Sequence, residues 1–179
     1  RVQSAVTGEL LHEMPQSLIY PGVPVIGDFD GDGTPEIGVQ STTDGVRKCA
    51  FHVYEYDATA GITEKWATPL PLCSGFLSAT AFDFEGDGAV EVLAHDDCFV
   101  YIFDGSTGDE HLRLSAPHAT WTEFVSLADV DGDLSADIFF SAHDVWNGSS
   151  PVGFGSCSYG AGDDGLRHGV FAYADPERA

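Results

Sequence analysis

Basic side chains are scarce in this sequence. Its 179 residues include 7 Lys and Arg against 29 Asp and Glu, which gives a formal net charge of −22 at pH 7. Nucleic acids and anionic membranes carry the same sign of charge, so the composition argues against both as partners. Hydrophobic residues make up 43% of the chain and aromatic residues 12%, which is typical of a folded domain rather than a disordered acidic tail. The carboxylates therefore either coat a solvated surface or are held in place by bound cations.

Long apolar runs are also missing. No stretch of about 18 apolar residues exists, so we expect no membrane-spanning segment. The length suffices for one domain with its own core. Because the chain starts at Arg1, without an initiator Met or a signal peptide, we expect it to be a mature or excised piece of a longer protein.

Zinc-type cysteine spacing is absent as well. The cysteines form no C-x-x-C pair, which argues against a zinc site. An even number of cysteines in a glycine-rich, lysine-poor chain favours two disulfides and a location outside the cytoplasm: extracellular, on the cell surface or periplasmic. Four buried free thiols are the alternative. The cysteines are Cys49, Cys73, Cys98 and Cys157.

Helical periodicity and catalytic motifs are missing too. No segment keeps an apolar period of 3.6 residues with capping residues, so very little helix is predicted. The sequence contains no G-x-S-x-G, no H-E-x-x-H and no phosphate-binding P-loop. These absences predict an all-β protein that is not an enzyme.

What the sequence does contain is an internal repeat. The stretch DFDGDGTPE at 28–36 (loop 1) recurs as DFEGDGAVE at 83–91 (loop 2) and as DVDGDLSAD at 129–137 (loop 3). An apolar run precedes each copy, and strand-like runs follow it. Each unit therefore reads strand, acidic loop, strand, loop, strand, turn, strand. Repeated four-stranded units of this length predict β-propeller blades. A β-sandwich with similar hairpins is the alternative.

The repeat also sets the predicted boundaries. Unit 1 spans 21–75, unit 2 spans 76–120, and unit 3 spans 121–179 without an outer strand. Residues 1–20, with an expected strand at 5–14, form the outer strand of a preceding or closing blade. Three blades fall below the usual 4–8. We therefore expect either part of a larger propeller of 6–8 blades or a six-bladed ring of two chains, with the open edges paired to the remaining blades or to a second copy.

The acidic loops themselves predict calcium sites. Ca²⁺ takes 6–8 oxygen ligands, and carboxylates at positions 1, 3, 5 and 9 of a tight loop, with the carbonyl at position 7, can converge on one ion. Glycines between them allow the wrap. The loops predict up to three Ca²⁺ ions. Their predicted ligands are Asp28, Asp30, Asp32, Thr34 (carbonyl) and Glu36; Asp83, Glu85, Asp87, Ala89 (carbonyl) and Glu91; and Asp129, Asp131, Asp133, Ser135 (carbonyl) and Asp137.

The three loops are not expected to be equal. Loop 2 has the longer Glu85 at position 3, and loop 3 has Leu134 where the others have glycine, a position that strains a residue with a side chain. Loop 1 is therefore predicted to be the strongest site. Metal-free turns rich in Asp and Gly are the alternative for each loop.

The predicted strands suggest a disulfide pairing. Cys49 opens the third strand of unit 1, and Cys73 lies just past the fourth, so antiparallel pairing brings them close. Cys98 opens the third strand of unit 2, on the edge where the long segment of unit 3 containing Cys157 emerges. We predict the pairs Cys49–Cys73 and Cys98–Cys157, one of three possible pairings.

The pattern D-x-D-G-D-G-x-x-[DE] resembles the FG-GAP (VCBS-type) repeat, known from the β-propellers of integrin α-subunits. Loop 1 matches it fully, loop 2 nearly so, and loop 3 except at Leu134, and the resemblance covers roughly residues 20–175. It implies Ca²⁺ in blade hairpins and a propeller, whereas the ligand does not carry over.

We therefore expect a secreted or surface calcium-binding module for binding, adhesion or scaffolding, with a protein or glycan ligand. The alternatives are the propeller part of a glycan-active enzyme and a lectin.

Overall fold

The protein is described here by a computed structural model, which covers residues 1–14, 18, 21–42, 49–71, 78–116, 124–143 and 168–173. All secondary-structure elements in these ranges are β-strands, which confirms the all-β prediction for this part of the chain. None of these ranges contains a helix that could cross a membrane. The strands are β1 (Val2–Gln3), β2 (Leu10–His12), β3 (Val25–Gly27), β4 (Glu36–Thr42), β5 (Cys49–Asp57), β6 (Gly61–Leu70), β7 (Thr80–Phe82), β8 (Glu91–His95), β9 (Phe99–Phe103), β10 (Glu110–Ser115), β11 (Ser126–Ala128), β12 (Asp137–His143) and β13 (His168–Tyr173).

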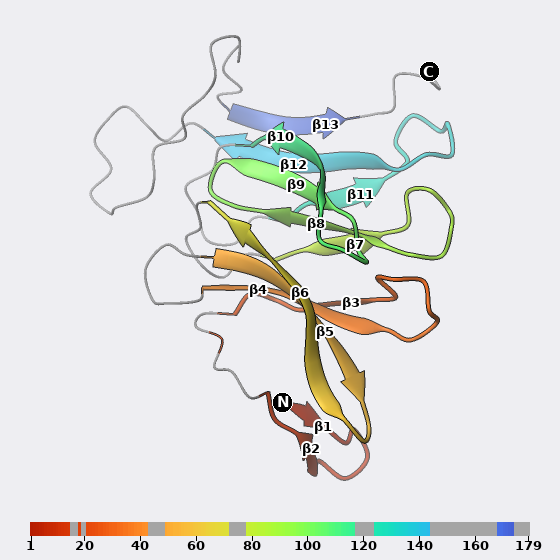
Figure 1. The fold of residues 1–179 in the computed structure, drawn as a ribbon. Coiled ribbons are helices and arrows are strands. Elements are labelled where there is room, and N and C mark those ends of the chain that lie inside the picture. The colour runs from red at the N-terminus through yellow and green to blue at the C-terminus, as the bar shows by residue number, and fades with distance from the viewer. Residues whose placement is uncertain are drawn as a thin grey trace, which may run out of the picture.

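The strands form four antiparallel sheets, each built from neighbours in the sequence. The sheets are β1–β2, β3–β4–β5–β6, β7–β8–β9–β10 and β11–β12–β13. They follow one another through the molecule in chain order, from the N-terminal hairpin at one end to β13 at the other (Figure 1). The three larger sheets correspond to the three units of the sequence repeat. Within the described residues they do not close into a ring.

The β7–β8–β9–β10 sheet packs between the other two larger sheets and is buried on both faces. On β8, Val92 and Ala94 pack into a core shared with the β3–β6 sheet, whereas Leu93 packs into a core shared with the β11–β13 sheet. The same alternation continues on β9, where Tyr101 faces the first core and Val100 the second. Successive side chains of a strand point to opposite faces, so apolar residues on both faces produce the nearly continuous apolar runs seen here. The sheets therefore pack face to face.

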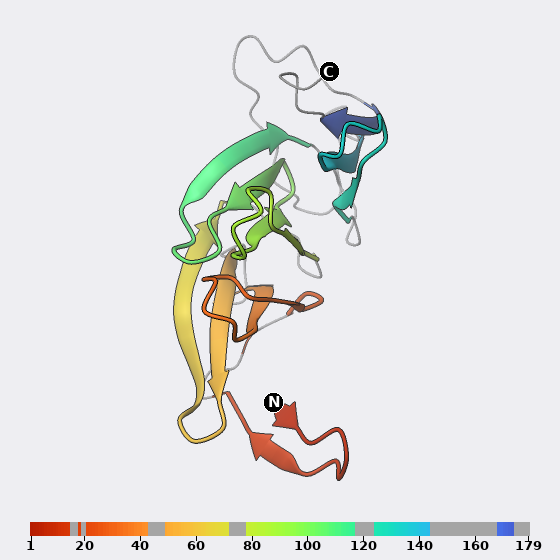
Figure 2. The ribbon, with the colours of Figure 1, turned by 90° about the vertical axis from the view of Figure 1, so that its right-hand side faces the viewer.

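The first strands of successive units lie close together. A parallel bridge joins Val23, just before β3, to Ser78, just before β7. The hydroxyl of Thr80 on β7 donates to the carbonyl of Val125, just before β11, at 2.8 Å. The sheets thus meet along their first-strand edges. Turned by 90°, the molecule shows β6 and β10 together on the opposite edge (Figure 2).

Fourth strands contact the hairpin turn of the next unit. Trp66 on β6 donates its Nε1–H to the carbonyl of Gly105, in the β9–β10 turn, at 2.7 Å. That turn contains Gly108, whose φ is +76° and where an added Cβ would lie 2.5 Å from the Trp66 ring. Only a glycine permits both this conformation and this approach.

The N-terminal hairpin repeats this contact. His12 on β2 lies with Nε2 3.2 Å from the carbonyl of Ala58, in the β5–β6 turn. An added Cβ at Gly61, whose φ is +88°, would meet the His12 ring at 3.0 Å. Ala58 and Gly61 hold the same places in their turn as Gly105 and Gly108 hold in theirs. His12 thus makes the contact with unit 1 that Trp66 makes with unit 2.

The N-terminus differs from the single strand expected at 5–14. Ser4 Oγ accepts the amides of Val6 and Thr7, and Gly8 has a φ of +74°, so the chain reverses there and β1 pairs with β2. The β9–β10 turn is built in the same way around Asp104 and Gly108. The N-terminal segment therefore forms a whole hairpin.

Candidate metal centres

The three acidic loops join the first and second strands of their sheets. Loop 1 joins β3 to β4, loop 2 joins β7 to β8, and loop 3 joins β11 to β12, all along one side of the molecule (Figure 1). In each loop the residue before position 1 pairs with position 9: Gly27 with Glu36, Phe82 with Glu91, and Ala128 with Asp137. Position 9 is thus the first residue of the second strand, which anchors it in the ladder.

The aspartate at position 1 organises each loop through backbone amides. In loop 1, Asp28 Oδ1 accepts the amide of Asp32 at 3.0 Å, and Oδ2 accepts that of Gly33 at 2.8 Å. Asp83 accepts the amides of Asp87 and Gly88 at the matching positions of loop 2. In loop 3, Asp129 accepts the amides of Gly132 and Leu134. The amide of Gly88 is the main cause that holds the pKa of Asp83 below its usual value. These bonds wrap the backbone around the carboxylate.

The wrap requires left-handed backbone at two positions in each loop. Loops 1 and 2 place glycine at both. Loop 3 has Gly132 at the first and Leu134 at the second, with φ of +72° and a side chain that is 92% exposed. An L-residue there is strained, as the sequence predicted, and the exposed side chain offers no packing in return.

The carboxylate at position 9 is buried in every loop. Glu36 Oε2 accepts the amide of Phe29 at 2.8 Å, and Glu91 and Asp137 accept the corresponding amides of their loops. Their exposures are 0%, 7% and 1%, respectively. Burial raises the pKa values of Glu36 and Glu91. Contact with Glu85 raises the pKa of Glu91 further. The second oxygen of Glu36, Oε1, is buried without a hydrogen-bond partner.

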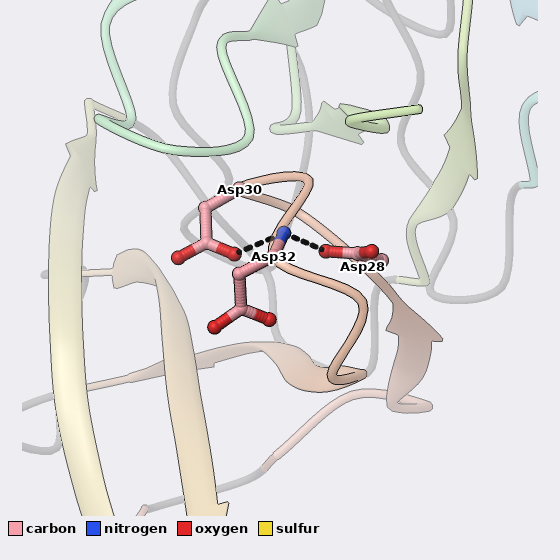
Figure 3. A group of neighbouring side chains, drawn as sticks. All are labelled: Asp28, Asp30 and Asp32. Atoms are coloured by element: carbon pink, nitrogen blue, oxygen red, sulfur yellow. Dashed lines mark hydrogen bonds between the residues drawn. The ribbon is translucent and has the colours of Figure 1, made fainter. Parts of the chain in front are cut away.

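Each loop brings three carboxylates to within 4.8 Å of one another. The groups are Asp28, Asp30 and Asp32; Asp83, Glu85 and Glu91; and Asp129, Asp131 and Asp137. In loop 1 the amide of Asp32 lies between the carboxylates of Asp28 and Asp30 and donates to both (Figure 3). The other predicted carboxylates, Glu36, Asp87 and Asp133, lie in the same loops but outside these groups.

The position-7 residues contribute their amides to the loop geometry. The amides of Thr34, Ala89 and Ser135 donate to the position-5 aspartates Asp32, Asp87 and Asp133. Their carbonyls remain predicted ligands.

Sequence reasoning missed one partner of loop 1. Lys65 on β6 forms an ion pair with Asp30, and its hydrogen bond is the main cause that lowers the pKa of Asp30 and raises that of Lys65. Lys65 is 35 residues from Asp30 along the chain. No local spacing signals such a contact.

The donor chemistry of these loops fits a hard divalent cation. The grouped side chains offer only carboxylate oxygens, the ligands that Ca²⁺ prefers. The unpartnered buried oxygen of Glu36 is a further unsatisfied negative group beside loop 1. Buried carboxylates are paired, bound to metal, or neutralised by a raised pKa, and a bound cation is one partner that would satisfy this oxygen.

Comparison with known proteins agrees with the loop pattern. Residues 28–94 match the family model described as the FG-GAP-like repeat. Over these residues the chain is similar to an FG-GAP-like repeat. The match spans loops 1 and 2 with the strands between them, and it confirms the resemblance seen in the sequence for these residues.

One solved structure extends the likeness beyond the FG-GAP-like repeat. The crystal structure of the V. cholerae biofilm matrix protein Bap1 is similar with a TM-score of 0.52 and 26% sequence identity, over 79% of this chain. The chain spans 20% of the length of that protein. No curated protein matches the chain.

The described cysteines are not free thiols. Cys49 and Cys98 are buried, and both are disulfide-bonded. Cys73 and Cys157 lie outside the described residues, so the predicted pairing stays a prediction.

Proposed function

We propose that the three acidic loops bind Ca²⁺ and that this binding stabilises the stacked sheets. The observation that carries the proposal is the unpartnered, fully buried oxygen of Glu36 beside three grouped carboxylates. Bound Ca²⁺ supplies two positive charges to such a group. The chain's own contribution is to hold the carboxylates together through amides and left-handed turns before the ion arrives.

Calcium titration of the chain tests this proposal. Isothermal titration should give up to three sites, and melting in EDTA should occur well below melting in millimolar Ca²⁺. A site filled at 100 times its dissociation constant adds about 2.7 kcal/mol to the free energy of unfolding.

A matched control separates metal binding from turn stability. Asp28→Asn should remove the loop 1 site. Asp57→Asn alters an aspartate that also accepts two turn amides, from Thr59 and Ala60, but lies outside the three carboxylate groups. It should leave the stoichiometry unchanged. If EDTA leaves the melting curve unmoved and no calcium binds, the proposal is wrong.

We further propose that the three larger sheets are successive blades of a β-propeller, with β1–β2 as the last two strands of another blade. The repeated contacts of His12 and Trp66 with equivalent turn carbonyls support one repeated packing operation. The meeting of first strands supports a common inner edge. A cryo-electron microscopy reconstruction of the full-length protein, or of an assembly of this chain, should show a ring of 6–8 blades. A compact monomer with no paired edge strands would contradict it.

We propose an adhesion or scaffold role outside the cytoplasm. The FG-GAP-like repeat and the likeness to a biofilm matrix protein support it. Millimolar calcium outside cells would keep the loops filled, and disulfides fit an oxidising compartment. Peptide mapping should find Cys49–Cys73 and Cys98–Cys157, and a Cys49–Cys98 link would contradict both.

We propose that this role is binding rather than catalysis, with a protein or glycan ligand. The sequence contains none of the catalytic motifs G-x-S-x-G, H-E-x-x-H and P-loop. A glycan array tests the lectin alternative. Incubation with polysaccharides, with an Asp83→Asn variant as control, should show no turnover. Turnover by the wild-type chain would favour the enzyme alternative.

A further inference from the structure

Lys65 reaches loop 1 because β6 has one residue more than its partner strand. Val53 pairs with Trp66 and Tyr54 pairs with Glu64, which leaves Lys65 as the extra residue of a β-bulge. A bulge interrupts the alternation of side chains and re-aims the extra one. The Lys65 ammonium lies against Asp30 Oδ2, and both side chains are about four-fifths buried, at 21% and 23% exposure.

The two oxygens of Asp30 serve different partners. Oδ1 accepts the amide of Asp32 inside the loop at 3.2 Å, whereas Oδ2 holds Lys65. Figure 3 shows one Asp30 oxygen at the Asp32 amide and the other directed away from it. Lys65 also feels the negative charge of Glu36, which raises its pKa further. Loop 1 thus contains a positive charge supplied by the chain itself.

Within the described part of the chain, loops 2 and 3 lack this arrangement. When the turn glycines Gly61 and Gly108 are aligned, Leu112 takes the place of Lys65 on β10, and it is 43% exposed. The extra residue of the β10 bulge is His111, which lies 3.7 Å from Asp104 in its own hairpin. Among the residues that the structure describes, no Lys, Arg or His forms an ion pair with a carboxylate of loop 2 or loop 3.

We propose that Lys65 is a resident counter-cation of loop 1 that stabilises the calcium-free loop and lowers its affinity for Ca²⁺. The inference rests on the calcium binding proposed above. Without Ca²⁺, Lys65 offsets part of the repulsion among Asp28, Asp30 and Asp32. With Ca²⁺, the ammonium and the ion share Asp30 and repel each other. Lys65 therefore makes the loop 1 site weaker, and the calcium-free fold firmer, than the carboxylates alone would.

The size of the effect follows from Coulomb's law. Two unit charges 4 Å apart interact by about 1 kcal/mol in water. The repulsion between the Lys65 ammonium and divalent Ca²⁺ is twice as large at the same distance, and it weakens as the distance increases. The repulsion therefore changes the dissociation constant by roughly tenfold, since 1.4 kcal/mol corresponds to that factor. Because Lys65 is partly exposed, added salt should shrink the difference.

Three variants of the full chain test the proposal. Lys65→Met keeps the length of the side chain and removes its charge, whereas Lys65→Arg keeps the charge. Arg113→Met is a matched control, because Arg113 lies on β10, where it pairs with Glu110 and lies over the rings of Phe99 and Tyr101. Calcium affinity is measured by isothermal titration, and melting temperature is measured in EDTA.

The expected result is one site about ten times tighter in Lys65→Met, together with a melting temperature several degrees lower in EDTA. Lys65→Arg and Arg113→Met should bind as the wild-type chain does. Unchanged or weaker binding by Lys65→Met would overturn the proposal, as would an unchanged melting temperature in EDTA. Failure of calcium binding itself is distinguished by Asp28→Asn: if this variant leaves the wild-type stoichiometry unchanged, loop 1 binds no calcium, and both proposals fall at that loop.

Discussion

Replacing Glu36 by glutamine should make the protein more stable than wild type without calcium and less stable than wild type with calcium. Glu36 is fully buried, one of its oxygens has a partner and the other has none. Burial outweighs the nearby charge of Lys65, since the pKa of Glu36 is raised overall. The ionised side chain therefore costs free energy when no metal is bound.

The magnitude can be worked from these contacts. An unsatisfied buried polar group costs about 1–3 kcal/mol. A charged group in that situation costs more than a neutral one. Glutamine keeps an oxygen for the amide of Phe29 and replaces the charged, unpartnered oxygen by a neutral amide nitrogen, so the gain is the difference between the two costs, and Glu36→Gln should stabilise the calcium-free protein by about 1–2 kcal/mol. For a chain of this length, that raises the melting temperature by about 3–6 °C. In saturating calcium the variant should lose the stabilisation that calcium binding at loop 1 adds, which is about 2.7 kcal/mol at 100 times the dissociation constant.

Differential scanning calorimetry in EDTA and in millimolar Ca²⁺ measures the stability of the variant without and with calcium. Glu9→Gln, at an exposed position in the N-terminal hairpin, is the control and should change neither. A lower melting temperature of Glu36→Gln in EDTA would refute the argument that the buried carboxylate is costly. An undiminished response to calcium would refute its role at loop 1.

Three further predictions concern single contacts. Leu134→Gly should raise stability by up to about 1 kcal/mol, because it relieves an exposed left-handed leucine while adding some chain entropy to the unfolded state; a lower denaturation midpoint in urea would contradict this. Trp66→Phe should cost about 1–2 kcal/mol, because the carbonyl of Gly105 loses its donor, and thermal melting that matches wild type would show that the contact contributes nothing. A hydrogen bond from Ser106 is the main cause that lowers the pKa of Asp104. The ionised Asp104 therefore stabilises the fold fully above its unfolded-state pKa near 4, and this stabilisation is lost as pH falls through the lower folded-state pKa. Melting curves of Asp104→Asn and wild type should converge in acid, and a constant difference down to pH 2 would be inconsistent with that.

The sequence by itself determined the acidic loops and the strands that flank them, although not the N-terminal hairpin. Short apolar runs between turn residues predict strands, and β8 and β9 are apolar on both faces because sheets cover both. The loop geometry is equally local, since aspartates two residues apart accept amides of the same turn. Even the strain at Leu134 could be predicted, because it occupies a position where the other two loops have glycine.

Only the tertiary structure decided which distant residues complete these loops and join the sheets. Lys65 reaches Asp30 through a bulge, and a one-residue change of register cannot be foreseen from a residue pattern. Likewise, His12 and Trp66 differ chemically, yet they make the same contact with a turn carbonyl. Their equivalence arises from the way one sheet packs on the next, which places whichever ring is present against the same backbone atom.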